Sequence, residues 1–305
     1  MRGHDRTPLE HSAELKLLAD KSCRDTGGVK LPWLVVEGRD DEHLFEQFEV
    51  DQIYQAEGRV NVEGILAGHV HEGAPGSGEF VFLTDCDGEG KSKSALLRNQ
   101  DRLVVTQCCD IEADLFAIGI VHRALSSKLP DEDAAAYVEA AKTMSLGFSL
   151  LRRRAHKVSV PMKMPPKGEV RIDLFDLPLQ LRLEWRDVSP DWRTVLEHVK
   201  GPLRWSDSQV SLVEEQVLDE PISFDRYGLG KDAINALFFM LVEDRPFPED
   251  DPACDWIKAP RPDFRGFGKW LHTHVDASDI RNWEVGRRIT AWQLARGVEL
   301  IKAES

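Results

Sequence analysis

Four acidic residues follow short apolar runs in this chain, at Glu37, Asp85, Asp87 and Glu112. Runs of β-branched and aromatic residues that stop at an acid or a glycine are typical of buried parallel strands. The carboxyl ends of such strands meet at one rim of a sheet, where open α/β sheets bind ligands. Because neighbouring carboxylates repel one another, the pattern indicates a cation between them. Hard oxygen ligands suit Mg²⁺ or Mn²⁺, so the expected chemistry is a metal-dependent reaction at phosphate.

The spacing of the acids agrees with shared ligation of a metal. Asp85 and Asp87 are two residues apart, so in an extended segment both side chains point the same way and can hold one ion together. Glu37 precedes Gly38, which is expected to permit the turn into the next helix without a Cβ clash. Glu112 is expected to bind a second metal or to orient the ligands of the first.

Each acid also has a purely structural interpretation. Glu37 and Glu112 suit the first turn of a helix, where the helix dipole favours acids. Asp85 and Asp87, followed by a glycine, also match turn chemistry. Asp40 and Asp41 are most simply N-terminal helix residues, with orientation of a metal ligand as the alternative.

The elements that must position these acids alternate between strand and helix patterns. Strands are predicted over 33–36, 52–55, 80–84 and 102–106, and helices over 40–48, 61–69 and 111–129. The alternation predicts an α/β domain over residues 31–130 with a mostly parallel sheet and right-handed crossovers. A helix is predicted within residues 1–30, and a mainly helical region over 131–305.

That C-terminal region contains helix patterns separated by a proline-rich hinge. The hinge is predicted at Pro161 to Gly168, and one or two strands at 169–185. Helices are predicted over 131–144, 191–199, 207–218, 231–242, 264–275 and 282–300.

Composition narrows the class of protein. The chain has 305 residues and 42% hydrophobic content, enough for one large domain or two ordinary ones. No apolar stretch approaches the roughly 18 to 20 residues of a membrane span, and the start lacks the apolar centre of a signal peptide, so a cytoplasmic location is expected. Five cysteines without a CxxC pair favour reduced thiols over disulfides or zinc.

The formal net charge of −14 argues against a chain that coats nucleic acid by itself. It is compatible with a nuclease, since metal ions offset part of the charge at an acidic site. The nucleic acid is expected to be bound by a basic partner or by the basic patch formed by residues 152–154, His156 and Lys157. The alternative for this patch is a solvated helix end.

Other polar and aromatic residues each have a functional and a structural interpretation. Lys91 and Lys93 lie in a glycine-rich segment and are candidates to meet phosphate, or else belong to a solvated loop. Lys231 opens a helix, where free N–H groups favour anions, but its segment lacks Walker A spacing and predicts no ATPase.

His272 and His274 face different directions on a helix, which favours a structural role. Six tryptophans are expected in the core and interfaces rather than as base-stacking platforms, namely Trp192, Trp205, Trp256, Trp270, Trp283 and Trp292.

Taken in order, these motifs resemble the Toprim fold shared by topoisomerases, primases and OLD-family nucleases, over about residues 31–125. The matching segments are Val36 to Asp41, Asp85 to Asp87 and Ile111 to Leu115, with Gly230 to Asp232 as a late element. Ala113-Asp114 stands where the family pattern has Asn-Tyr. The pattern is most similar to the OLD and AriB-like branch, found beside ABC-type ATPases in phage-defence systems such as PARIS.

The resemblance implies a Mg²⁺- or Mn²⁺-dependent endonuclease for which RNA, particularly tRNA, is favoured over DNA. It further implies a toxic effector controlled by an ABC-type ATPase partner and homodimeric when active. Glu37, Asp85, Asp87 and Glu112 would hold the metal, Glu37 would act as general base or acid, and Lys231 is a further candidate catalytic residue.

The alternative is a non-catalytic Toprim module that serves as a structural subunit of an ATPase complex, docking through its helical half. A primase or topoisomerase fragment fits poorly, because no catalytic tyrosine context, zinc module or polymerase-sized remainder is present.

Overall fold

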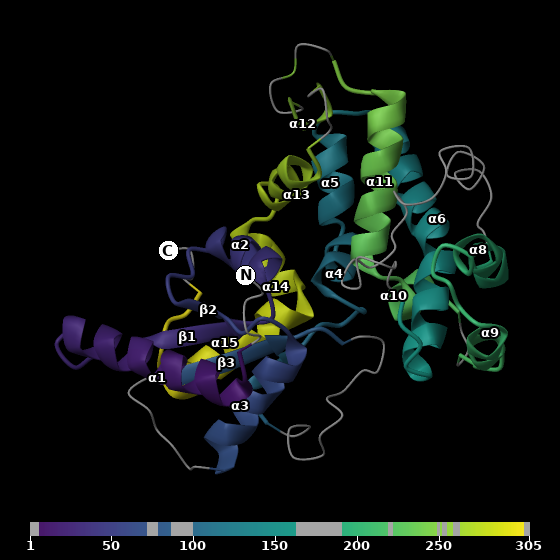
Figure 1. The fold of residues 1–305 in the computed structure, drawn as a ribbon. Coiled ribbons are helices and arrows are strands. Elements are labelled where there is room, and N and C mark those ends of the chain that lie inside the picture. The colour runs from purple at the N-terminus through teal and green to yellow at the C-terminus, as the bar shows by residue number, and fades with distance from the viewer. Residues whose placement is uncertain are drawn as a thin grey trace. The chain divides into compact units, whose positions relative to one another are not determined.

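A computed structural model describes residues 6–71, 79–86, 100–162, 191–218, 222–248, 251, 255–258 and 263–301. The chain forms two compact units, one of residues 1–107 with 275–305 and the other of residues 108–274. Figure 1 shows the strands of the first unit and the long helices of the second. Among the described residues, no helix is long and apolar enough to cross a membrane.

The first unit contains a four-stranded parallel sheet in its described part, with strand order β2-β1-β3-β4. The strands are β1 Pro32–Val36, β2 Ile53–Gln55, β3 Glu79–Thr84 and β4 Leu103–Val105. In the centre of the sheet, Leu34 of β1 lies opposite Ile53 on one side and Val81 on the other. The predicted α/β class and the positions of all four strands are therefore confirmed.

Helices surround this sheet and bury its apolar strands. They are α1 Pro8–Asp25, α2 Arg39–Glu46, α3 Arg59–His71, α14 Ala277–Asn282 and α15 Glu284–Arg296. The strand β1 is buried along its whole length, as an uninterrupted apolar run between two helical layers requires. At the packing of α1 on α3, a Cβ on Gly64 would lie 2.6 Å from the Cβ of Pro8, so the two helices approach closely.

The C-terminal helices belong to the sheet unit, so the predicted division into residues 1–30, 31–130 and 131–305 differs from the two units. Trp283 is 1% exposed and stacks on Phe45 of α2, with ring centroids 5.8 Å apart. Arg296 of α15 pairs with Glu79 at the start of β3, at 3.2 Å. A helical pattern shows which face is buried but not which neighbour covers it, so the sequence grouped these helices with the preceding ones.

The second unit is helical in its described part, and α6 and α11 lie side by side in it (Figure 1). Its helices are α4 Ile111–Ala117, α5 Ile120–Ser126, α6 Asp131–Lys157, α8 Trp192–Val199, α9 Asp207–Glu214, α10 Phe224–Tyr227, α11 Gly230–Asp244, α12 Asp255–Lys258 and α13 Phe264–His272.

Two of the predicted helix boundaries in this unit are corrected. The single helix predicted over 111–129 is broken at Gly119, whose φ of 81° is left-handed and ends α4 before α5 begins. The helix predicted over 131–144 continues to Lys157. The strands predicted at 169–185, and all of the hinge beyond Met162, lie outside the described residues.

The prediction that the tryptophans are core residues is confirmed where the structure describes them, whereas the helix predicted over 264–275 ends at His272 and leaves His274 beyond it. Five of the six tryptophans are at most 8% exposed, and Trp205 is half-buried with its indole N–H donating to the Pro161 carbonyl at 2.9 Å. His274 Nδ1 lies 3.0 Å from the Trp270 carbonyl oxygen and Nε2 lies 3.2 Å from Ser127 Oγ. These contacts give His274 a structural role.

The cysteines of the described part are free thiols, as predicted, and they differ in exposure. Cys86, Cys108 and Cys109 are buried while Cys23 is partly exposed, and burial, followed by the charge of Asp114, raises the pKa of Cys108. We expect Cys23 to be alkylated by iodoacetamide well before these three in the folded protein, because the thiolate is the reactive form. Peptide mapping by mass spectrometry measures the order, and equal rates for Cys23 and Cys108 would contradict it.

The helix α8 is capped by an acid whose charge depends on pH. The Thr194 N–H donates to the Asp191 carboxylate at 2.8 Å, and this hydrogen bond lowers the pKa of Asp191. We expect Asp191→Ala to lower the free energy of unfolding by about 1 kcal/mol at neutral pH. A depressed folded-state pKa stabilises the fold above the unfolded-state pKa, and that contribution is lost as pH falls through the folded-state value. Urea unfolding should therefore show a smaller difference between wild type and variant in acid, and an unchanged difference would contradict the assignment.

Candidate functional site

The first candidate site lies at the carboxyl ends of the two central strands. From β1 the sheet continues to β2 on one side, and from β3 it continues to β4 on the other. Open α/β sheets bind ligands outside the strand ends at such a reversal of strand order. Glu37 directly follows β1 and Asp85 directly follows β3, so both acids stand at this point.

A direct hydrogen bond joins these two residues. The backbone N–H of Asp85 donates to Glu37 Oε1 at 2.9 Å. Both residues are half-buried, and the backbone carbonyl of Glu37 accepts the N–H of Gly58 at 2.8 Å. The Glu37 carboxylate is therefore oriented toward the end of the neighbouring strand.

A buried hydroxyl group lies beside the acids at the end of β3. Thr84 is 1% exposed, and its Oγ1 has no hydrogen-bond partner within the described part of the chain. After it, the Cys86 N–H donates to Thr106 Oγ1 at 2.8 Å, which ties the segment beyond β3 to the end of β4. Because an unsatisfied buried hydroxyl is costly, its place next to Asp85 favours a further polar group at these strand ends.

The turn after Glu37 is held by a hydrogen bond to Asp41 and does not need the glycine that the sequence predicts for it. The Gly38 N–H donates to Asp41 Oδ2 at 2.9 Å, which supports the helix-terminal interpretation of Asp41. Gly38 has a φ of −148°, which is extended backbone. A Cβ at this position would lie 3.9 Å from its nearest neighbour, an ordinary contact. The prediction that glycine is needed here to avoid a Cβ clash is therefore wrong.

Glu112 and Lys231 form a second pair, within the second unit. Glu112 lies in the first turn of α4 and is 8% exposed. Lys231 lies at the start of α11, and its Nζ is 3.8 Å from Glu112 Oε1. The structure thus joins two candidates that are 119 positions apart in the sequence. The early-helix interpretation of Glu112 also fits this position.

Asp110 is not among the residues that the sequence predicts for the site, yet it supports this second pair. It is 4% exposed, and its Oδ1 accepts the N–H of Ala113 at 2.8 Å and that of Gly230 at 2.8 Å. Burial and the neighbouring charge of Glu112 raise the pKa of Asp110. An Asp before a helical run signals an N-cap, but only the tertiary structure shows that it also binds the start of α11.

Gly230 allows the starts of α4 and α11 to meet. A Cβ on Gly230 would lie 2.0 Å from the Ala113 nitrogen and 2.3 Å from the Glu112 carbonyl carbon. Because both neighbours are backbone atoms, no side-chain rotation can relieve such a contact. The pairing of Lys231 with Glu112 therefore depends on glycine at position 230.

The basic patch near the end of α6 packs against other parts of its own unit. Arg152 Nε lies 3.1 Å from Asp232 Oδ2, and both side chains are largely buried. The Arg154 guanidinium lies 3.7 Å from the centre of the Trp192 ring. The two arginines are therefore structural contacts, which differs from the predicted phosphate grip and from the predicted solvated helix end.

The remaining predicted candidates cannot be placed from the described residues. Asp87, Lys91 and Lys93 all lie outside the ranges that the structure describes.

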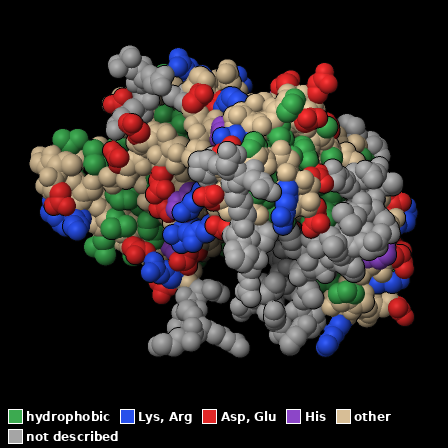
Figure 2. All heavy atoms as spheres, turned by 90° about the horizontal axis from the view of Figure 1, so that it is seen from above, with side chains coloured by type: hydrophobic (Ala, Val, Ile, Leu, Met, Phe, Trp, Pro, Cys, Tyr) green, Lys and Arg blue, Asp and Glu red, His purple; other side chains and the backbone are tan. Residues whose placement is uncertain are grey.

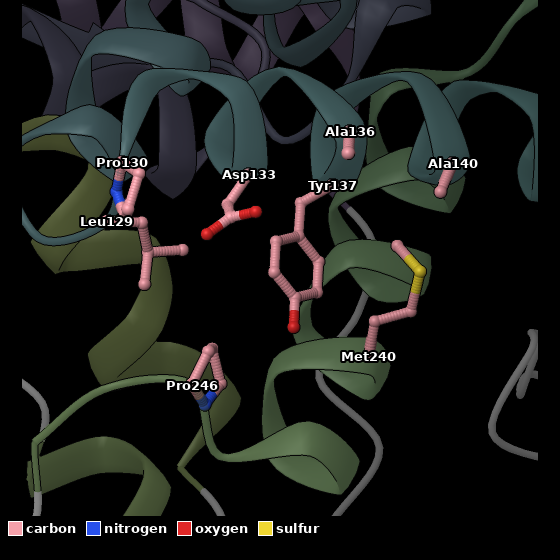
Figure 3. Close-up of a pocket in the computed structure, with 8 residues that line it drawn as sticks. All are labelled: Leu129, Pro130, Asp133, Ala136, Tyr137, Ala140, Met240 and Pro246. Atoms are coloured by element: carbon pink, nitrogen blue, oxygen red, sulfur yellow. The ribbon is translucent and has the colours of Figure 1, made fainter.

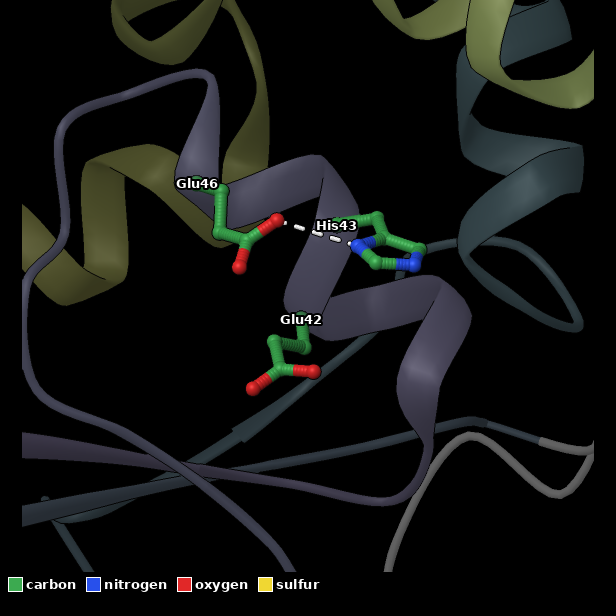
Figure 4. Close-up of side chains that lie close together, drawn as sticks. All are labelled: Glu42, His43 and Glu46. Atoms are coloured by element: carbon green, nitrogen blue, oxygen red, sulfur yellow. Dashed lines mark hydrogen bonds and ion pairs between the residues drawn. The ribbon is translucent and has the colours of Figure 1, made fainter.

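A different group of metal-ligand types occurs on α2, shown in Figure 4. The ligand atoms of Glu42, His43 and Glu46 lie within 4.8 Å of one another. His43 Nδ1 is 3.0 Å from Glu46 Oε2, and Glu42 accepts a hydrogen bond from the Gln55 amide. Neighbouring residues on one helix meet in this way without an ion, so we assign no metal to this group.

A pocket of about 520 Å³ lies between α6 and α11 of the second unit (Figure 3). Tyr137 points into it, and its hydroxyl donates to Asp244 Oδ2 at 2.7 Å. The lining is Leu129, Pro130, Asp133, Ala136, Tyr137, Ala140, Met240 and Pro246. The lining contains none of the predicted site residues.

Comparison with known proteins adds no assignment, since no family model matches this chain and no curated protein matches its sequence.

Proposed function

We propose that this chain is a Toprim-type, divalent-metal-dependent endonuclease. The observation that carries the proposal is the hydrogen bond from the Asp85 N–H to the Glu37 carboxylate, at the place where the strand order reverses. Two acids at adjacent parallel strand ends are the arrangement that the sequence pattern predicts for a metal site.

The donor groups at these strand ends fit a hard cation. Glu37 and Asp85 supply carboxylate oxygens, and the buried Thr84 hydroxyl beside them has no partner among the described residues. Mg²⁺ is commonly bound by one or two carboxylates together with water and substrate phosphate. Glu37 and Asp85 would hold the ion, with Asp87 as a further ligand proposed from the sequence. When bound, such an ion polarises phosphate and activates water.

The chain's own residues would orient the substrate and move the proton. Glu37, oriented through the Asp85 N–H, is the proposed general base or acid, which needs a carboxylate held within reach of the reacting oxygen. Lys231 has a side chain that is 58% exposed, so its ammonium is accessible to a phosphate while it pairs with Glu112. A cation at this position would stabilise negative charge on the substrate.

The substrate and setting follow from the resemblance. RNA, particularly tRNA, is the proposed substrate ahead of DNA, and the chain would be the toxic effector of a phage-defence system under an ABC-type ATPase. A formal charge of −14 is compatible with binding to a basic surface of such a partner.

A cleavage assay tests the proposal directly. We expect the purified chain to cut tRNA with Mg²⁺ or Mn²⁺, to stop with EDTA, and to bind Mn²⁺ more weakly after Asp85→Asn. Glu139→Gln is the matched control, because this acid on α6 has a side chain that is 70% exposed. Failure to cut tRNA, other RNA or DNA with either ion, alone and with the ATPase partner, would overturn the proposal.

A non-catalytic module is the second candidate, and the same hydrogen bond favours it in another way. A Glu37 carboxylate that accepts the Asp85 N–H also fastens the end of β1 to the end of β3. Glu37→Ala separates the two candidates when cellular toxicity and complex assembly are both measured. Loss of toxicity with assembly intact supports the nuclease, and loss of neither supports the module.

A further inference from the structure

The pocket between α6 and α11 carries a negative charge beside an aromatic ring. Asp133 is the acid of its lining, and none of the described lining residues is basic. Figure 3 shows the Asp133 carboxylate extending into the same space as the Tyr137 side chain. The two residues are four positions apart on α6, so they lie on one side of the helix.

The rest of the lining is apolar, and its exposure changes from one side of the pocket to the other. Met240 of α11 is 1% exposed and closes the inner side, whereas Asp133 and Ala136 are exposed. The charge therefore lies at the mouth and apolar surface lies deeper. Small-molecule sites occupy roughly 300 to 1,000 Å³ and combine apolar walls with a few polar groups. The volume of about 520 Å³ falls in that range.

The hydroxyl group of Tyr137 can only accept a hydrogen bond from a ligand. It donates its proton to Asp244 Oδ2 at 2.7 Å, and a phenol has no second proton to give. The face of the ring also attracts cations. Asp133, the ring and the hydroxyl oxygen thus all favour a positively charged hydrogen-bond donor.

The basic side chains near the pocket leave this charge unbalanced. Lys128 precedes the first lining residue, but its Nζ pairs with Asp251 at 2.8 Å. Arg245 precedes Pro246 and is exposed outside the lining. Among the described residues, no side chain pairs with the Asp133 carboxylate. A ligand is therefore the group that can supply the opposite charge.

The charge of the whole chain favours cations as well. The formal net charge is −14, and Figure 2 shows acidic side chains interspersed over the described surface that faces the viewer. Such a field raises the local concentration of cations without selecting one place. A test of the pocket must therefore separate this general attraction from binding at Asp133.

We propose that the pocket binds a small organic cation, a primary ammonium group carried on an aryl or alkyl body. The ammonium pairs with Asp133 at the mouth and contacts the Tyr137 ring, and the apolar body lies against Met240. This inference is independent of the proposed nuclease activity, because no predicted site residue lines the pocket.

Three probes of similar size and different charge test the class of ligand, namely phenethylammonium, phenethyl alcohol and phenylacetate. We expect phenethylammonium to bind the full chain with a Kd of about 0.3 mM, and the alcohol to bind about tenfold more weakly because it lacks the charge. Phenylacetate should bind weakest. Isothermal titration calorimetry measures the three affinities. Equal or tighter binding of either other probe, or no saturable binding of phenethylammonium below about 10 mM, would overturn the proposal.

Asp133→Asn tests the ion pair. It should weaken phenethylammonium binding about fivefold and leave phenethyl alcohol binding unchanged. Asp131→Asn is the matched control, because it makes the same change of charge in the same helical turn, at a side chain that is 79% exposed and outside the lining. Equal weakening by the two variants would show general attraction only and would contradict the assignment.

Ala140→Leu tests the location of the apolar body. The larger side chain occupies part of the pocket without a change of charge, so both phenethylammonium and phenethyl alcohol should bind at least about tenfold more weakly. Circular dichroism and thermal unfolding check that the variant folds. Unchanged phenethylammonium binding by a folded Ala140→Leu chain would place the ligand elsewhere. If this variant does not fold, the comparison of Asp133→Asn with Asp131→Asn decides.

Discussion

Replacement of Glu37 by glutamine is expected to lower metal-dependent tRNA cleavage by at least about a hundredfold, the usual contribution of a general acid or base. The amide could not carry the proton of the proposed reaction, and it would replace a proposed anionic metal ligand by a neutral one. Its carbonyl oxygen can still accept the Asp85 N–H that Glu37 Oε1 accepts at 2.9 Å. Activity should therefore fall while the melting temperature stays near that of the wild type. Initial rates at saturating Mg²⁺ and thermal unfolding measure the two effects.

Glu37→Ala provides the contrast for this prediction. Alanine removes the acceptor as well, so the buried end of β3 loses a hydrogen bond and stability should fall by about 1 kcal/mol or more. If the glutamine variant cleaves tRNA as fast as the wild type, Glu37 only fastens the two strand ends and is not the general acid or base of the reaction.

Gly230→Ala is expected to destabilise the second unit by about 3 kcal/mol, at the upper end of the cost of overpacking. The new Cβ would approach the Ala113 nitrogen to 2.0 Å, so the start of α11 must move away from α4. That movement would also break the hydrogen bond from the Gly230 N–H to Asp110 at 2.8 Å. The free energy of unfolding in urea measures the loss.

Gly268→Ala is the matched control on α13. A Cβ on this helical glycine would have no neighbour within 4 Å. Alanine should then stabilise the helix by about 0.5 to 1 kcal/mol, because it removes the conformational freedom of glycine in the unfolded chain. The two substitutions are chemically identical, so the expected opposite signs isolate the backbone contact. A neutral Gly230→Ala variant would contradict the close approach of the two helix starts.

Local patterns predicted the elements of the sheet well. The strands β1, β3 and β4 are short apolar runs, and their length and their β-branched or aromatic residues favour a buried strand over a buried helix. The break at Gly119 was missed because a single glycine is tolerated in many helices, and only its φ of 81° ends this one.

The candidate site was predictable in part. The acids at the ends of β1 and β3 are visible because they interrupt apolar runs, and parallel strands must bring such ends to one edge. Asp110 was missed as a site residue because its importance comes from Gly230, which is 120 positions away. The roles of Arg152 and Arg154 were misjudged for the same reason, since a charged helix end and a buried ion pair have the same local sequence.

The sequence by itself determined the parallel α/β sheet, the order of its strands and helices along the chain, and the placing of Glu37 and Asp85 after two of those strands. These features depend on hydrophobic periodicity and on local turn chemistry, which act between near neighbours. Only the tertiary structure decided that Glu37 accepts the Asp85 N–H, that Asp110 joins the starts of α4 and α11, and that α14 and α15 cover the sheet. The physical reason is that an apolar face or a carboxylate can be satisfied by many partners, and the choice among them depends on packing between segments far apart in the chain.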